Sequence, residues 1–113
     1  VERKNLVWSL LLTCEHASNV LPEKWTWGEQ DLKNELPTKH WGIDIGAQMF
    51  TLDILKSLND TNQAQIRNGT PKTAGSASSI CAEFSRLLLD CNRPIGSETM
   101  FRRQCDGEEV ELN

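Results

Sequence analysis

The protein has 113 residues, of which 38% are hydrophobic and 25% are charged, and its formal net charge is −4. A chain of this length fits one small domain, so we expect residues 1–113 to form a single domain. The acidic balance excludes a general nucleic-acid binder, which carries a basic face. No apolar run approaches the roughly 20 residues that a membrane-spanning helix needs, so we expect no membrane partner.

The cysteines and the N-terminal residues indicate a cytoplasmic location. Cys14, Cys81, Cys91 and Cys105 form no Cys-x-x-Cys pair, which favours free thiols in a reducing compartment over disulfides or a zinc ribbon. Residues 1–14 are basic and then apolar, but the apolar part is short and lacks a small-x-small cleavage site, unlike a signal peptide. The sequence starts with valine rather than methionine and shows no stop signal at its end, so we expect a fragment of a longer protein. The sequence does not indicate an oligomeric state.

The first half of the chain predicts a strand, a loop and two helices. Residues 6–13 form a nearly continuous apolar run, which predicts a strand buried on both faces of a sheet. A loop follows, and residues 31–36 predict a short helix ended by Pro37. Residues 44–59 predict the main helix, with Asp44 as its N-cap. Its apolar residues recur at three- and four-residue steps and are Ile45, Met49, Leu52, Leu55 and Leu58.

The second half predicts one more strand between two polar segments. Residues 60–79 are polar and predict a flexible loop, with a short strand at 64–67. Residues 84–90 form a second apolar run of strand length, and a polar, acidic loop begins at Ile95. The order strand, loop, helix, loop, strand predicts an α/β domain with a mostly parallel sheet flanked by helices. Ligands of such sheets bind beyond the carboxyl ends of the strands.

The first candidate site surrounds the two histidines. A catalytic zinc ion takes three protein ligands, usually histidine and carboxylate side chains. His16 follows a predicted strand and Asp44 begins a predicted helix, so they are the first candidates, with His40 and Glu15 in reserve. The alternative is that His16 only bonds loop backbone and Asp44 only caps its helix. Spacing alone favours this alternative, because no His-x-x-x-His or His-Glu-x-x-His pair is present.

The second candidate site is the stretch SRLLLDCNRP. Side chains alternate along a strand, so Arg86 and Asp90 would share one face. Arginine offers a planar fork that binds a carboxylate through two hydrogen bonds, which makes Arg86 and Arg93 candidates for substrate binding. The alternative is a structural Asp90–Arg93 pair that holds the turn, and the pattern alone does not separate the two.

Three sequence blocks together resemble the N-formylglutamate amidohydrolase (N-formylglutamate deformylase) family. They are LLTCEHASNVLP, HWGIDIGAQMF and SRLLLDCNRP, in this order, and they cover most of residues 6–94. In the family, an apolar strand ends in a histidine motif with a proline soon after. A His-x-x-x-Asp-x-Gly-Ala helix start follows, and then Ser-Arg-apolar-apolar-x-Asp-x-Asn-Arg.

The resemblance implies a fold, an activity and a set of roles. Family members are α/β hydrolases similar in fold to zinc exopeptidases. They cleave the amide of N-formyl-L-glutamate, at the end of histidine degradation, or of a related N-acyl amino acid, releasing formate or another acid and the amino acid. By position, the resemblance implies zinc bound by His16 and Asp44, or by Glu15 in place of Asp44. It implies Glu15 as the catalytic base or a reserve ligand. The residues implied to bind the substrate carboxylate, or else to support the structure of the site, are Arg86, Asn92 and Arg93.

The sequence also departs from the family pattern. Residues 70–79 look like an added loop, and the family domain is longer, with a further His-Ser motif in its second half. No histidine follows His40, so the zinc site is expected to be incomplete and this chain alone inactive. The alternative hypothesis is a truncated or degenerate homologue without catalysis, which serves as a binding or structural domain.

Overall fold

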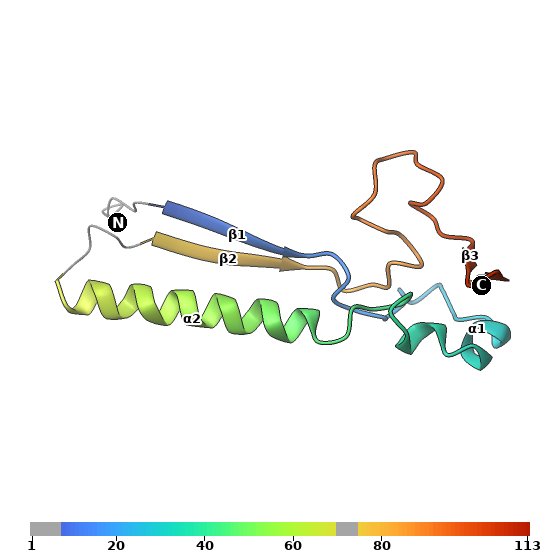
Figure 1. Ribbon diagram of the computed structural model, residues 1–113, viewed down its shortest axis with the longest axis horizontal. Coiled ribbons are helices and arrows are strands. Elements are labelled where there is room, and N and C mark those ends of the chain that lie inside the picture. The colour runs from blue at the N-terminus through green and yellow to red at the C-terminus, as the bar shows by residue number, and fades with distance from the viewer. Residues whose placement is uncertain (1–7, 70–74) are drawn as a thin grey trace. The chain divides into compact units, whose positions relative to one another are not determined.

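The computed structural model of the protein describes residues 8–69 and 75–113 (Figure 1). Its elements in chain order are β1 (Trp8–Cys14), α1 (Glu29–Lys33), the 3-10 helix η1 (Leu36–Thr38), α2 (Ala47–Arg67), β2 (Gly75–Cys81), β3 (Gln104–Cys105) and β4 (Glu108–Glu109). The chain divides into two compact units. The first combines the described parts of residues 1–13 and 49–80, and the second combines residues 14–48 and 81–113.

The first unit is a small mixed α/β layer. Strands β1 and β2 form a two-stranded parallel sheet that packs against α2 (Figure 1). Parallel neighbours need a long crossover connection, and α2 supplies it. The predicted α/β class is therefore confirmed, although only two parallel strands are seen among the described residues.

Strand β2 lies where the sequence predicted a loop. Residues 75–79, assigned to the loops at 60–79 and 70–79, belong to this strand, while residues 70–74 lie outside the described part. The segment GSASSIC has few large apolar side chains, so it lacks the usual signal of a strand. Its small residues fit the neighbouring strand instead: a Cβ atom at Gly75 would overlap the indole ring of Trp8, and the Ser76 and Ser9 hydroxyls are 3.4 Å apart.

Helix α2 begins later than predicted, at Ala47 rather than after Asp44. Gly46 has φ +84°, a left-handed conformation that cannot belong to the helix. The backbone carbonyl of Asp44 accepts a hydrogen bond from the Ala47 N–H at 3.0 Å. The carboxylate of Asp44 is used elsewhere, in the candidate site. The prediction that Asp44 caps this helix is therefore wrong.

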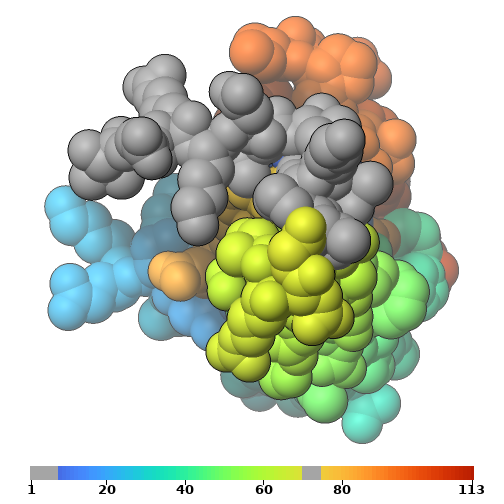
Figure 2. All heavy atoms as spheres, turned by 90° about the vertical axis from the view of Figure 1, so that its left-hand side faces the viewer, coloured from blue at the N-terminus to red at the C-terminus, as the bar shows by residue number. Residues whose placement is uncertain are grey.

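Helix α2 also ends later than predicted, at Arg67, so the short strand predicted at 64–67 is wrong. The polar stretch DTNQAQIR contains neither glycine nor proline, and nothing in it stops a helix. Gly69, at φ +72°, follows the last turn and is typical of a helix end. Most side chains of these last turns lie at the surface, yellow-green in Figure 2, but Asn62 is buried and accepts a hydrogen bond from the Gly75 N–H at 3.2 Å.

Residues 84–90 do not form the predicted second strand but a tight turn in the second unit. The N–H groups of Leu88 and Leu89 both point to the carbonyl of Ser85, at 3.0 and 3.5 Å. Leu87 is 2% exposed and packs with Leu36 and Cys105 in the core of this unit. An apolar run that fills a small core from a turn has the same composition as a buried strand, which explains the wrong prediction.

A buried carboxylate organises the other end of the second unit. Helix α1 starts two residues before the predicted helix at 31–36, and Pro37 lies inside η1 rather than ending α1. Asp31 is fully buried and accepts hydrogen bonds from the N–H groups of Gly28, at 3.2 Å, and Glu111, at 2.9 Å. Burying a carboxylate is tolerated when backbone donors satisfy it, so Asp31 ties two distant segments together.

The segment predicted as an acidic loop contains a small hairpin. Strands β3 and β4 pair antiparallel around Asp106 and Gly107, whose φ angles are +53° and +83°. An Asp-Gly pair with two positive φ angles is a typical hairpin turn. A bridge between Trp27 and Leu112 then joins the end of the chain to the loop before α1.

Strand β1 confirms the predicted strand over its described residues but not its burial on both faces. Leu10 and Leu11 are 40% and 54% exposed, and Met49 and Phe50 on α2 are 72% and 68% exposed. Parallel sheets are normally covered on both faces, so this layer is less covered than its sequence predicts. Within the described residues, no helix has the length and apolar character needed to cross a membrane.

The close approach of β1 and β2 predicts the effect of adding one methyl group. Gly75→Ala should lower the free energy of unfolding by about 1–3 kcal/mol, the usual cost of overpacking, because its Cβ meets Trp8. Urea unfolding measures this change. Ser78→Ala, an exposed change on the same strand, is the matched control. An unchanged midpoint for Gly75→Ala would contradict the packing described here.

Candidate functional site

Four polar side chains of the second unit form one hydrogen-bonded cluster. They are His16, Asp44, Arg86 and Asp90, and they come from all three sequence blocks described above. We call them the His16 cluster.

One backbone bond and one side-chain bond bring the segments of the His16 cluster together. The N–H of Asp44 donates to the carbonyl of His16 at 3.1 Å. The buried Ser85 hydroxyl donates to the carbonyl of Gly42 at 2.9 Å, which places Arg86 beside Asp44. Two single hydrogen bonds therefore bring the helix-start segment against the first strand's end and against the turn at 84–90.

Arg86 is the centre of the His16 cluster. Its Nη1 atom lies 2.9 Å from His16 Nδ1 and 2.9 Å from Asp44 Oδ1, and its Nε donates to the carbonyl of Trp41 at 3.0 Å. The Arg86 side chain is 16% exposed. A guanidinium has only donors, so this one group satisfies three acceptors from two segments of the second unit, one after β1 and one before α2.

For a neutral His16 ring, these contacts select one tautomer. When Arg86 Nη1 donates to His16 Nδ1, Nδ1 carries the lone pair and the ring proton resides on Nε2. The Nε2–H then donates to Asp90 Oδ1 at 2.8 Å. In this tautomer His16 Nδ1 and Asp44 Oδ2, 3.2 Å apart, are both acceptors, and the Arg86 cation holds them side by side.

Asp90 is the buried acid of the cluster, with 3% exposure. Burial raises the pKa of its carboxyl, but hydrogen bonds from His16 and the Asn92 N–H and the charges of His16 and Arg93 outweigh burial, so the pKa lies below its ordinary value. Arg93 Nε is 3.6 Å from Asp90 Oδ2. The predicted Asp90–Arg93 pair is therefore present, and Asp90 in addition orients the histidine ring.

The other predicted site residues lie around the cluster. Glu15 is half-buried in the turn that follows β1, directly before His16. Asn92 is exposed, and the Arg93 side chain is 44% exposed. His40 is exposed, and its ring lies against Trp41 with centroids 4.6 Å apart and a tilt of 38°.

From its spacing Asp90 was predicted to pair with Arg93, and the structure adds a hydrogen bond between Asp90 and His16. The alternation rule placed Arg86 and Asp90 on one face, and both do contact His16, although they lie on a turn rather than a strand. Trp41 and Ser85 were missed as supports of the cluster, because a backbone carbonyl and a buried hydroxyl leave no pattern in a sequence.

The His16 cluster fits a metal site only in part. Among residues 8–69 and 75–113, no three His, Cys, Asp or Glu side chains are grouped so that they could hold a metal ion. The two ring nitrogens of His16 face different carboxylates, so Asp44 and Asp90 cannot meet at one ion. His16 Nδ1 and Asp44 are a converging pair of donors of the kind zinc accepts. A complete site needs a further ligand from outside the described residues.

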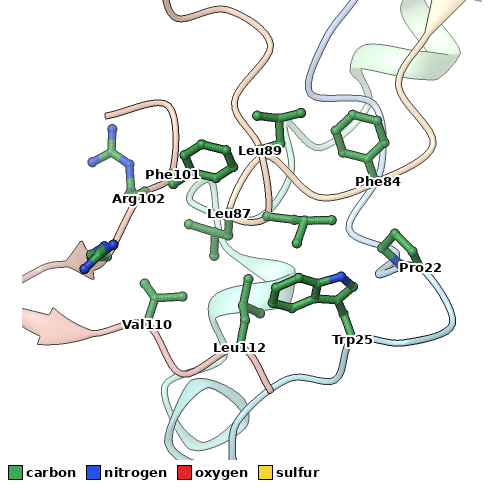
Figure 3. A pocket seen from close by; sticks show the side chains of 11 residues that line it. Pro22, Trp25, Phe84, Leu87, Leu89, Phe101, Arg102, Val110 and Leu112 are labelled. Atoms are coloured by element: carbon green, nitrogen blue, oxygen red, sulfur yellow. The ribbon is translucent and has the colours of Figure 1, made fainter. Parts of the chain in front are cut away.

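An apolar pocket of about 650 Å³ lies on the second unit (Figure 3). Its lining residues are Pro22, Trp25, Phe84, Leu87, Leu88, Leu89, Phe101, Arg102, Arg103, Val110 and Leu112. The turn at 84–90 thus places Arg86 in the His16 cluster, and its leucine side chains line this pocket and fill the core. The volume lies within the range of small-molecule pockets.

Comparison with known proteins gives one structural likeness. No family model and no curated protein matches the sequence. The crystal structure of the gene product Atu2144 from Agrobacterium tumefaciens is similar, with a TM-score of 0.55 and 26% identity over 89% of this chain. The match covers 32% of that chain. The protein therefore shares a mixed α/β fold with part of a larger protein, while the family and the activity stay predictions.

The lowered pKa of Asp90 predicts a pH-dependent stability. A carboxyl whose pKa is lowered by folding stabilises the protein above its unfolded pKa, and this contribution disappears as the pH falls through the folded pKa. Asp90→Asn should therefore cost about 1–3 kcal/mol at pH 7, where a charge-assisted hydrogen bond is lost. The difference from wild type should shrink as the pH falls below 3.8, the ordinary pKa of this carboxyl.

Urea unfolding at several pH values measures this dependence. Glu98→Gln removes an exposed carboxylate of the same unit and is the control. If Asp90→Asn showed the same loss at pH 2.5 as at pH 7, the charge of Asp90 would not stabilise the fold, and the proposed pairing with His16 would be contradicted.

Proposed function

We propose that the protein contributes part of the active site of a metal-dependent amidohydrolase that cleaves N-formyl-L-glutamate or a related N-acyl amino acid. One observation carries the proposal. The three sequence blocks that resemble the N-formylglutamate amidohydrolase family are far apart in the chain, and their polar residues meet in the His16 cluster. Chance polar residues at the ends of unrelated segments have no reason to converge in this way.

In this proposal, His16 Nδ1 and Asp44 hold a zinc ion with a third ligand from outside the described residues. Asp90 holds the opposite side of the His16 ring at 2.8 Å, the arrangement in which a carboxylate fixes the tautomer of a metal-binding histidine. When bound, zinc would provide a hydroxide near neutral pH and stabilise the charge that develops on the carbonyl oxygen. His40 would have to leave Trp41 to take part.

The remaining residues would handle the proton and the substrate. Glu15, next to His16, would accept a proton from the attacking water and deliver it to the leaving amine. Arg93, with 44% of its side chain exposed, would bind the substrate carboxylate, and Asn92 would lie beside it. Arg86 is committed to the His16 cluster in this structure, so a role in carboxylate binding would require it to leave its three partners.

A non-catalytic role is the second candidate. The observation that favours it is the closure of the cluster: Arg86 neutralises Asp44 and occupies the His16 lone pair, and the described residues group no three metal ligands. A homologue that keeps these contacts as structure would bind no zinc and hydrolyse no substrate.

Formate release from N-formyl-L-glutamate, measured on the full-length protein with its zinc content, separates the two candidates. The proposal expects hydrolysis and one zinc ion per active site. His16→Ala should lower both, with activity reduced by more than about 100-fold, at least as much as loss of a residue that only orients a ligand. Glu98→Gln is the matched control on an exposed carboxylate.

Two outcomes would contradict the proposal. Wild-type activity in His16→Ala would remove His16 from the site. A zinc-free and inactive full-length protein would leave the non-catalytic role.

A further inference from the structure

We infer that Arg86 is a displaceable internal cation, and that its guanidinium and a divalent metal ion compete for the same atoms of His16 and Asp44. The inference rests on the metal-binding part of the proposed function and adds a role for Arg86 that the sequence did not predict. In that prediction Arg86 bound the substrate carboxylate.

The first argument is the use of lone pairs. In the neutral ring protonated on Nε2, Nδ1 of His16 has a single lone pair, and Arg86 Nη1 lies 2.9 Å from it and uses that lone pair. A metal ion bound to Nδ1 needs that same lone pair. The two cations therefore exclude each other at this atom, whatever other ligands complete the site.

The second argument is the convergence of two acceptors on one cation. Arg86 Nη1 lies at the same distance, 2.9 Å, from His16 Nδ1 and Asp44 Oδ1. A neutral imidazole and a carboxylate that share a cation are the donor set of many metal sites. Here the guanidinium fills the position between them and holds the two side chains together.

The third argument is that this contact can be exchanged. The Asp44 side chain is 48% exposed, so solvent screens its ion pair with Arg86. The buried carboxylate, Asp90, stays on Nε2 of His16 and takes no part in the exchange. The ring can therefore keep its orientation while Nδ1 changes its partner from Arg86 to a metal ion.

Zinc titration by isothermal calorimetry, on the full-length protein, tests the competition. Arg86→Gln removes the competing charge, so its zinc affinity should rise by about fivefold, the effect expected of one partly exposed ion pair. Arg93→Gln removes an equal charge from the neighbourhood of Asp90, and its zinc affinity should change by less than about twofold. An unchanged or weaker affinity in Arg86→Gln, or an absence of zinc binding in both proteins, would overturn the inference.

A second measurement uses the wild-type protein and avoids any loss of folding in the variant. Phenylglyoxal modifies accessible guanidinium groups, and peptide mass spectrometry reports each arginine separately. Labelling of Arg86 should be slow without metal and several-fold faster with zinc, because its partners are lost. The rate at Arg103, which is exposed, should stay constant and serves as the reference. Equal Arg86 labelling with and without zinc would overturn the inference.

Neither readout depends on hydrolysis, so failure of the inference and failure of the proposed function are distinguishable. A protein that binds zinc more tightly as Arg86→Gln but releases no formate would keep the competition and lose the amidohydrolase activity. An active zinc enzyme whose zinc affinity does not change in Arg86→Gln would keep the amidohydrolase activity and lose the competition.

Discussion

The guanidinium of Arg86 is the interaction on which the candidate site depends. It reaches the carbonyl of Trp41, the ring of His16 and the carboxylate of Asp44 at 2.9–3.0 Å. The acceptors belong to two segments of the second unit, one after β1 and one before α2, and a planar group with several fixed donors suits this better than a lysine would. Asp90 completes the arrangement by accepting a hydrogen bond from Nε2, the opposite ring nitrogen of His16.

The first unit has the features expected of one layer within a larger α/β fold. Its parallel strands have one helix packed on them, and Leu10, Leu11, Met49 and Phe50 remain exposed. Parallel sheets are stable when helices cover both faces. The structural match also indicates part of a larger fold, because the likeness extends over 89% of this chain but only 32% of the Atu2144 chain. Coverage by further polypeptide would explain why a strand that reads as buried is exposed here.

The sequence predicted those features that leave a periodic or local signal. The apolar strand at Trp8–Cys14 and the body of α2 follow from apolar spacing. Strand β2 could not be predicted in this way, because its small residues are explained only by their packing against Trp8 on the neighbouring strand. The turn at 84–90 imitates a strand in composition. Within the site, the three sequence blocks and their order made the residues of the His16 cluster candidates. The central place of Arg86 was not predicted, because it depends on tertiary hydrogen bonds that no local pattern encodes.

The tautomer of His16 tests this account most directly. Nitrogen-15 NMR distinguishes the two ring nitrogens, and the chain has only one other histidine, His40, whose exposed ring provides an internal reference. At a pH where both rings are neutral, the account predicts that His16 is held in the Nε2–H form, with the Nδ1 signal of an unprotonated acceptor. Arg86→Gln should relax this preference toward that of His40. A His16 ring protonated on Nδ1, or insensitive to Arg86, would contradict the account.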